Sequence, residues 1–222
     1  EGHTQLKLAI AAGANPTNHM YGEPTDDDIL EDAARVHHLR KAIGDKPVLM
    51  ADANKNAKLT QAIRFAKLVE PCNLAWFEDP VLQADPRLMA QLRRETTIPI
   101  AAGSTGTSDI STLREYFLNE SIDIAQPNVR DIGGFTGGIR AAGLAQAFNI
   151  QLEMGGNYPH LNMHLHAGVP NGGRVEFHLG GWRIGEALFD GMPSPIRGWV
   201  TLTDKPGLGF TPKAGILDLA VK

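Results

Sequence analysis

Short apolar runs alternate with amphipathic segments along most of the 222-residue chain, and this alternation limits the possible fold more than any other feature. The apolar runs have the length of strands and recur about every 25 residues, as repeated strand–helix units do. They are Gln5–Ala11, Pro47–Asp52, Leu74–Asp79, Ile98–Gly103, Ile122–Pro127, Ile150–Met154 and Arg174–His178. Strands separated by helices in this way predict a parallel sheet with right-handed crossovers.

The expected strands are apolar on both faces, and none has the pattern of an exposed edge. We therefore expect an α/β fold in which residues 1–190 form a (β/α)8 TIM-type barrel that lacks its first βα unit. Residues 191–222 are rich in Gly and Pro, and we expect them to form a C-terminal return segment that leaves the barrel and packs elsewhere.

Composition excludes several classes of partner. The net charge of −4 provides no general basic surface, so we expect neither nucleic acid nor a membrane as a partner. No apolar run is long enough to span a bilayer, and the N-terminal residues lack a signal-peptide pattern. The single cysteine, Cys72, allows no internal disulfide and fits a reducing compartment, so we expect a cytoplasmic protein.

Polar side chains end the expected strands at the barrel face where such enzymes carry their chemistry. Asp52 ends one strand and Glu78 ends the next, so their carboxylates should meet at one mouth. Two such carboxylates repel one another unless a cation lies between them, and oxygen ligands of this kind suit Mg²⁺. The alternative is structural: Asp52 caps the next helix, and Glu78 pairs with a surface Lys or Arg. Spacing alone leaves both open.

Five motifs occur in order over nearly the whole chain: "LMADANKN", "WFEDP", "IPIAAG", "IAQPNVRDIGGFTGGIRAAGLAQAFNI" and "RVEFH". Together they resemble the barrel domain of the enolase superfamily, of the mandelate racemase and muconate lactonizing enzyme type. The resemblance implies Mg²⁺ held by three strand-end carboxylates, and α-proton abstraction from a carboxylate substrate by a Lys or His base. It also implies an α+β capping domain, absent from this chain, on which the return segment "DKPGLGF" packs.

The resemblance assigns roles to five residues, position by position. Asp52 and Glu78 match two metal ligands, and Asn54 matches a polar neighbour of the metal. Lys7 matches the first Lys of the family's K-x-K motif, which makes it a candidate catalytic residue. Glu176 matches the acid on the last strand that hydrogen-bonds the substrate.

Four positions depart from the family pattern. Ser104 stands where the third metal ligand, a Glu, is expected, and Ala9 replaces the second Lys of the K-x-K motif. Asn128 replaces the Asp that orients the catalytic His, and Gly155 replaces that His. A serine hydroxyl is a neutral and weak ligand, so the affinity for Mg²⁺ should fall. The His–Asp pair is lost as a whole, which points to altered or abandoned chemistry.

Other residues are candidates for the missing roles. His160 is the first choice for a new base, because we expect it in a loop at the barrel mouth, with His178 second. Glu153 is either a raised-pKa acid or a hydrogen-bonded interior acid. Arg130 and Asn128 are candidates for substrate binding, and the alternative for Arg130 is a surface ion pair.

Three functions follow from these observations. The first is a Mg²⁺-dependent lyase or isomerase that acts on a hydroxycarboxylate of the acid-sugar type, as a dehydratase or racemase, and we expect a homo-oligomer. The second is a non-catalytic relative that keeps the scaffold. The third is a phosphate-binding barrel enzyme built on the glycine turns "GSTGTSD" and "GGFTGG".

Overall fold

The computed structural model describes residues 2–11, 23–104, 109–153, 155–156 and 158–216. The chain forms two compact units. The strand-rich unit comprises His3–Ala102 and Leu113–Ala125, and the helix-rich unit comprises Gly103–Thr112 and Gln126–Lys222 with the first two residues. No described helix is long and apolar enough to cross a membrane.

The strand-rich unit is built on five parallel strands that pair in sequence order. They are β1 (Gln5–Ala9), β2 (Val48–Asp52), β3 (Phe77–Glu78), β4 (Ile100–Ala102) and β5 (Ile124–Ala125). Each lies inside an expected apolar run, so the sequence prediction is confirmed here, with shorter strands. The register places Asp52 beside Glu78, because both end neighbouring parallel strands.

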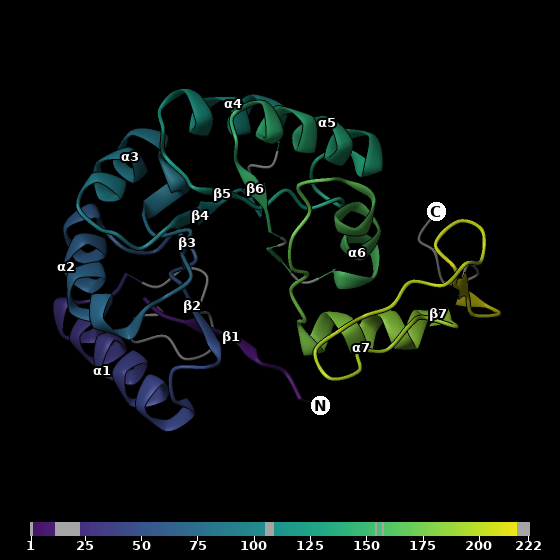
Figure 1. Cartoon of the computed structure of the whole chain (residues 1–222), viewed down its shortest axis with the longest axis horizontal. Coiled ribbons are helices and arrows are strands. Elements are labelled where there is room, and N and C mark those ends of the chain that lie inside the picture. Colours follow the sequence, from purple (N-terminus) through teal and green to yellow (C-terminus); the bar gives the residue numbers. More distant parts are fainter. Residues whose placement is uncertain (1, 12–22, 105–108, 154, 157, 217–222) are drawn as a thin grey trace. The chain divides into compact units, whose positions relative to one another are not determined.

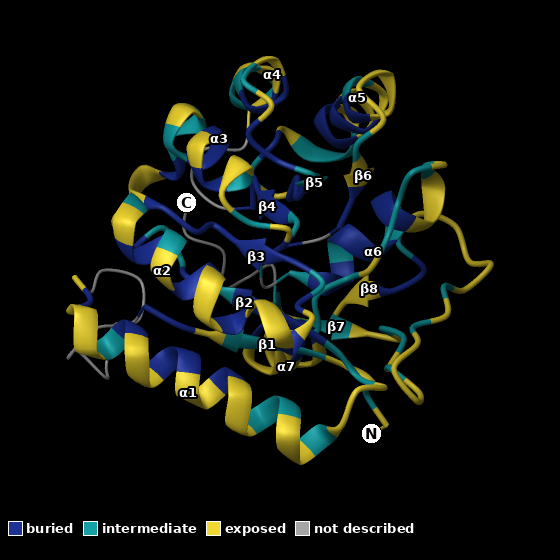
Figure 2. Ribbon diagram, turned by 60° about the vertical axis from the view of Figure 1, so that its left-hand side comes forward, coloured by how far each residue is buried: buried dark blue, intermediate teal, exposed yellow. Residues whose placement is uncertain are grey.

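Helices α1 (Asp26–Ile43), α2 (Leu59–Val69) and α3 (Pro86–Arg94) lie along the outer side of these strands (Figure 1). Helix α1 begins with a capping box between Thr25 and Asp28 and buries one stripe of side chains. Figure 2 shows its exposed residues on the side that faces away from the strands. Helix α4 (Ile110–Leu118) follows β4, and short 3₁₀ turns occur at Glu70–Cys72 and Leu82–Ala84.

The helix-rich unit contains α5 (Gly134–Ala147), β6 (Gln151–Leu152), α6 (Pro159–Gly168) and α7 (Leu179–Leu188). The sequence prediction of a strand at Arg174–His178 is wrong, because these residues form no ladder. Leu152 instead makes an isolated parallel bridge with Gly172. The end of α7 continues into β7 (Phe189–Asp190), which pairs antiparallel with β8 (Thr211–Pro212) in the return segment.

Candidate functional site

Five charged side chains on or shortly after β1, β2 and β3 form a group that we call the acidic cluster. Its members are Lys7, Asp52, Lys55, Glu78 and Asp79. The Lys7 ammonium donates to Glu78 Oε1 at 2.6 Å and lies 3.1 Å from Asp52 Oδ2. One cation therefore bridges the two carboxylates that the sequence predicts to converge. Glu78 pairs with a lysine, as the structural alternative has it, but not at the surface: Glu78 is 1% exposed, and its partner Lys7 comes from β1, on the far side of β2.

Burial sets the electrostatics of this cluster. The pKa of Asp52 is raised to about 7, first by desolvation and then by the charge of Glu78, while Lys7 opposes the rise. Asp52 Oδ1 accepts the backbone N–H of Asn54 at 2.9 Å, and Trp76 Nε1 donates to Glu78 Oε2 at 3.1 Å. Each acid is thus held in place by a residue two positions away along the chain.

Asp79 is a further buried acid that the sequence reasoning did not single out. It is 3% exposed, and its Oδ1 has no hydrogen-bond partner among the described residues. Its Oδ2 lies 3.8 Å from the Lys55 ammonium, and burial raises its pKa to about 7. The signal was present in the sequence as a second acid directly after Glu78 at the end of an apolar strand.

The acidic cluster fits a divalent cation. Its three carboxylates outnumber its two ammonium groups, and the raised pKa values of Asp52 and Asp79 show that burial leaves their charge poorly compensated. Hard oxygen donors in such surroundings suit Mg²⁺. Among the described residues, however, no three His, Cys, Asp or Glu side chains form a complete metal site. The donor set that the cluster offers is therefore the two carboxylates bridged by Lys7, those of Asp52 and Glu78, completed by waters.

A second group, in the helix-rich unit, consists of buried neutral side chains, and we call it the neutral cluster. Its members are Ser104, Gln126, Asn128 and Asn162, none more than 3% exposed. Asn162 donates to Asn128 Oδ1 at 3.2 Å and accepts the backbone N–H of Val129 at 2.8 Å. Asn128 Oδ1 also accepts the N–H of Arg130 at 3.0 Å. Asn128 therefore uses much of its hydrogen-bonding capacity inside the protein, although the sequence predicts that it binds substrate.

Glycines 155 and 156 fit closely against the neutral cluster. A Cβ at Gly155 would lie 2.5 Å from Ser104 Cβ, a distance that folded proteins essentially never show. A Cβ at Gly156, whose φ is +89°, would lie 2.7 Å from Asn128 Nδ2. The N–H of Gly156 donates to Glu176 Oε2 at 2.6 Å. Backbone atoms thus fill the space beside Ser104 and Asn128.

Other predicted residues have structural partners. Arg130 pairs with Asp131 through two hydrogen bonds of 2.7 and 3.0 Å and lies over the Tyr158 ring, as the ion-pair alternative predicts. Glu153 is 1% exposed and pairs with Arg174; burial raises its pKa and Arg174 opposes the rise. Glu153 is therefore a hydrogen-bonded interior acid.

Two predictions about histidines are wrong. His160 lies in α6, directly after its first residue, and not in a loop. Its ring contacts Tyr158 and Phe189, its Nδ1 has no partner among the described residues, and burial lowers its pKa. His178 does not share a strand face with Glu176. It is the N-cap of α7, where its Nδ1 accepts the N–H of Gly181.

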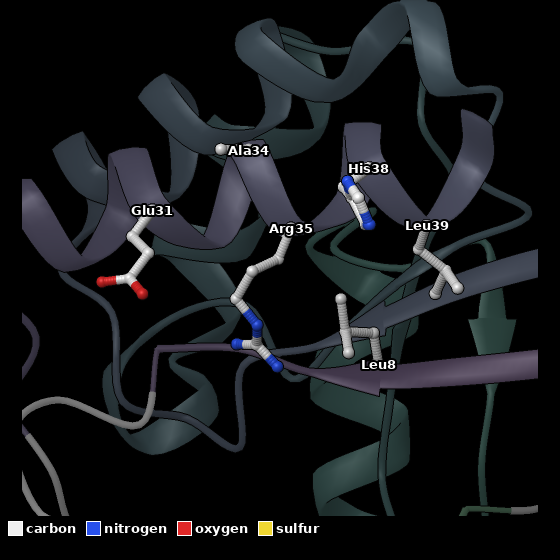
Figure 3. A pocket seen from close by; sticks show the side chains of 6 residues that line it. All are labelled: Leu8, Glu31, Ala34, Arg35, His38 and Leu39. Carbon is white, nitrogen blue, oxygen red and sulfur yellow. The ribbon is translucent and has the colours of Figure 1, made fainter. Parts of the chain in front are cut away.

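A surface pocket of about 510 Å³ lies on the other face of β1 and is separate from the acidic cluster. It is lined by Leu8, Glu31, Ala34, Arg35, His38 and Leu39 (Figure 3). Successive strand residues point to opposite faces, so Leu8 points away from the cluster that contains Lys7. Arg35 bonds Asp32 at 2.5 Å, which ties its charge to α1.

Comparison with known proteins settles the family. Residues 1–216 match the family described as enolase C-terminal domain-like. The chain belongs to the enolase superfamily. It is 32% identical over 212 residues to the 3,6-anhydro-alpha-L-galactonate cycloisomerase of Streptomyces coelicolor, which covers 93% of this chain and 55% of that protein. It is 30% identical to the L-talarate/galactarate dehydratase of Salmonella typhimurium over 86% of this chain and 46% of that one.

Solved structures of the enolase superfamily agree with this assignment. The L-talarate dehydratase of Polaromonas sp. JS666, complexed with Mg and L-glucarate, matches all of this chain and 56% of its own, with a TM-score of 0.83 and 27% identity. A racemase from Streptomyces coelicolor with bound magnesium matches 95% of this chain and 53% of its own, with a TM-score of 0.79 and 28% identity. The chain spans about half the length of the relatives it matches. The fold is thus the α/β barrel of this superfamily.

Within the superfamily, this chain's departures from the usual pattern are spatially linked. Ser104 and Gly155 are in contact, and the Asn128 amide donates to the Gly155 carbonyl at 3.5 Å. The three positions where the resemblance leads us to expect a Glu, an Asp and a His are therefore neighbours, and none of them carries an ionisable side chain in this chain. The glycine turn proposed to bind phosphate at "GSTGTSD" includes residues 105–108, which lie outside the described residues.

Proposed function

We propose that the protein is a Mg²⁺-dependent enzyme that abstracts the α-proton of a hydroxycarboxylate of the acid-sugar type, giving dehydration or racemisation. The observation that carries this proposal is the pair of half-buried Asp52 and buried Glu78 with the Lys7 ammonium between them. The names of the relatives support it, since they include acid-sugar dehydratases, a cycloisomerase and a racemase.

In this proposal Asp52 and Glu78 hold the metal, and Ser104 or water takes the place of the missing third carboxylate. Mg²⁺ bound at Asp52 and Glu78 would supply a Lewis acid toward the carboxylate of a substrate. Asn54 and Asn128 then offer polar contacts to the substrate. The two bonds from Arg130 to Asp131 make Arg130 the weakest of the predicted substrate contacts.

Lys7, His160 and Glu176 are the proposed catalytic residues. The Lys7 ammonium donates to Glu78 Oε1 at 2.6 Å. This hydrogen bond holds the amine within the acidic cluster and places a carboxylate beside its proton. Burial favours the neutral form of His160, which is the form that accepts a proton. The N–H of Gly156 donates to Glu176 Oε2 and orients this carboxylate. Glu176 is the proposed hydrogen-bond partner of the substrate.

A second function is favoured by the packing of Gly155 on Ser104. With no room for a side chain at residue 155, the scaffold as folded cannot carry the family's His at that position. A relative that binds an acid without turning it over is consistent with this loss. The expected cytoplasmic location and homo-oligomeric state remain predictions in either case.

Solvent deuterium incorporation separates the two functions. The full-length protein is incubated in D₂O with Mg²⁺ and, one at a time, with galactonate, gluconate, arabinonate, galactarate and talarate. Incorporation at the α-carbon of at least one acid, abolished by Lys7→Met or Asp52→Asn, supports the enzyme. The absence of exchange with every acid, together with calorimetric binding of at least one, favours the ligand-binding relative.

A further inference from the structure

The Lys7 ammonium occupies the place of a cation between the two proposed metal ligands. It donates to Glu78 Oε1 at 2.6 Å and lies 3.1 Å from Asp52 Oδ2, and all three residues belong to the strand-rich unit. The Lys7 side chain extends from β1 past the end of β2 to reach Glu78 on β3. An ammonium group thus holds the position that the proposed function gives to Mg²⁺.

The second oxygen of each acid already has a donor close to it in the chain. Asp52 Oδ1 accepts the backbone N–H of Asn54, and Glu78 Oε2 accepts the indole N–H of Trp76. The oxygens that face a bridging cation are therefore Asp52 Oδ2 and Glu78 Oε1, and these are the two that Lys7 contacts. A metal ion that bridges the two acids needs the same atoms as the Lys7 ammonium.

These oxygens cannot hold both cations without repulsion between them. Mg²⁺ lies about 2.0–2.1 Å from its oxygen ligands, so an ion bound to Glu78 Oε1 would lie within about 5 Å of the Lys7 ammonium. At that separation a divalent ion and a unit charge repel by more than the thermal energy, even in a dielectric as high as that of water. One cation therefore displaces the other.

The Lys7 side chain has a way out of the acidic cluster. The side chains of Lys7 and Asp52 are 17% and 13% exposed, whereas Glu78 is buried, so the cluster opens to solvent on the side of Lys7 and Asp52. Ala9 lies two residues along β1 on the same face, and it is exposed and carries only a methyl group. The long lysine side chain can therefore leave Glu78 and keep its ammonium in water.

We propose that Lys7 is an internal counter-ion of the metal site, and that Mg²⁺ binds by displacing its ammonium from Glu78 and Asp52. The inference rests on the proposed function and deepens it, because it makes metal binding and the release of Lys7 one exchange of cations. In the metal-free protein Lys7 holds the two carboxylates together. When the metal binds, the amine leaves Glu78, so the position of a proposed catalytic residue depends on whether the metal is present.

Calorimetric titration of the full-length protein with Mg²⁺ alone is the first test. Lys7→Met removes the competing cation, so this variant should bind Mg²⁺ at least about 10-fold more tightly than the wild type. Lys55→Met is the matched control, because it removes the same charge from the same cluster, but from a position 3.8 Å from Asp79 Oδ2. It should tighten binding less than Lys7→Met does. Equal tightening by both variants, or none by Lys7→Met, would overturn the inference.

Chemical labelling of the wild type is the second test, and it applies even if Lys7→Met does not fold. Acetic anhydride should acetylate Lys7 slowly in the metal-free protein and several-fold faster at saturating Mg²⁺, because the amine has then left Glu78. Lys67, which is exposed and pairs with Glu95, is the internal standard, and mass spectrometry of peptides gives both rates. A Lys7 rate that does not change while Mg²⁺ saturates the protein would overturn the inference.

The outcomes separate this inference from the function on which it rests. If neither the wild type nor Lys7→Met binds millimolar Mg²⁺, the proposed function is wrong and the inference is withdrawn with it. Binding by Lys7→Met alone would support the inference and contradict the proposed function, which needs a metal in the wild type. Binding by both proteins with equal affinity would overturn the inference alone.

Discussion

Substitution of Gly155 by Ala tests how the neutral cluster is packed. The new Cβ would lie 2.5 Å from Ser104 Cβ, so one of the two must move by at least about 0.5 Å to reach a distance that real Cβ atoms tolerate. Inserting a methyl group into a well-packed interior costs about 1–3 kcal/mol. For a chain of this length, such a loss lowers Tm by about 2–12 °C.

The assay is urea and thermal unfolding of the full-length protein, with two further variants. Ser104→Gly removes the side chain that the new methyl meets, so the double variant should recover about 1–2 kcal/mol relative to the sum of the single effects. Gly143→Ala is the matched control. Gly143 lies within α5 with nothing within 4 Å of its Cβ position, so alanine there should stabilise the protein by about 0.5–1 kcal/mol.

The reasoning is refuted if Gly155→Ala behaves like Gly143→Ala. Equal or greater stability would mean that residue 155 has room for a side chain. The absence of the expected Glu, Asp and His from these neighbouring positions would then need another explanation, and a histidine at residue 155 would become compatible with the scaffold.

Three further predictions concern substitutions of ionisable side chains. Lys7→Met leaves two buried carboxylates without their shared cation, so unfolding should become easier by about 3–5 kcal/mol, and millimolar Mg²⁺ should restore part of the lost Tm. Burial lowers the pKa of His166 to about 4, so the unfolded chain binds a proton at a higher pH than the folded protein does. The free energy of unfolding should therefore fall by at most about 3 kcal/mol as the pH drops from 6.5 toward 4. His166→Asn should flatten this part of the profile of stability against pH. Arg40 donates to four backbone carbonyls, and Arg40→Lys, which cannot reach them all, should lower Tm measurably by differential scanning calorimetry while leaving Mg²⁺ binding unchanged.

The sequence predicted that Asp52 and Glu78 meet, because that geometry follows from strand ends alone, but it did not single out Lys55 and Asp79. Neighbouring parallel strands that end at the same level bring their last side chains together, which is the relation of Asp52 to Glu78 in the ladder. Lys7 was predicted from its place in the first strand and the family motif. The raised pKa of Asp52 could not be predicted, since its largest cause is desolvation by burial.

The helix-rich unit was predicted less well. The run at Arg174–His178 has the alternation of a strand but no partner in a ladder, and His178 bonds the N–H of Gly181 to begin a helix. Pro159 directly before His160 is a common first residue of a helix, a signal that the loop prediction overlooked.

Calorimetric titration of the full-length protein with Mg²⁺ tests the central claim most directly. The account predicts saturable binding in the millimolar range or tighter, lost in Asp52→Asn and in Glu78→Gln. Asp85→Asn, which changes an acid that caps α3, should bind as the wild type does. Saturable binding that survives the loss of both Asp52 and Glu78, or no binding to the wild type at millimolar Mg²⁺, would contradict the account.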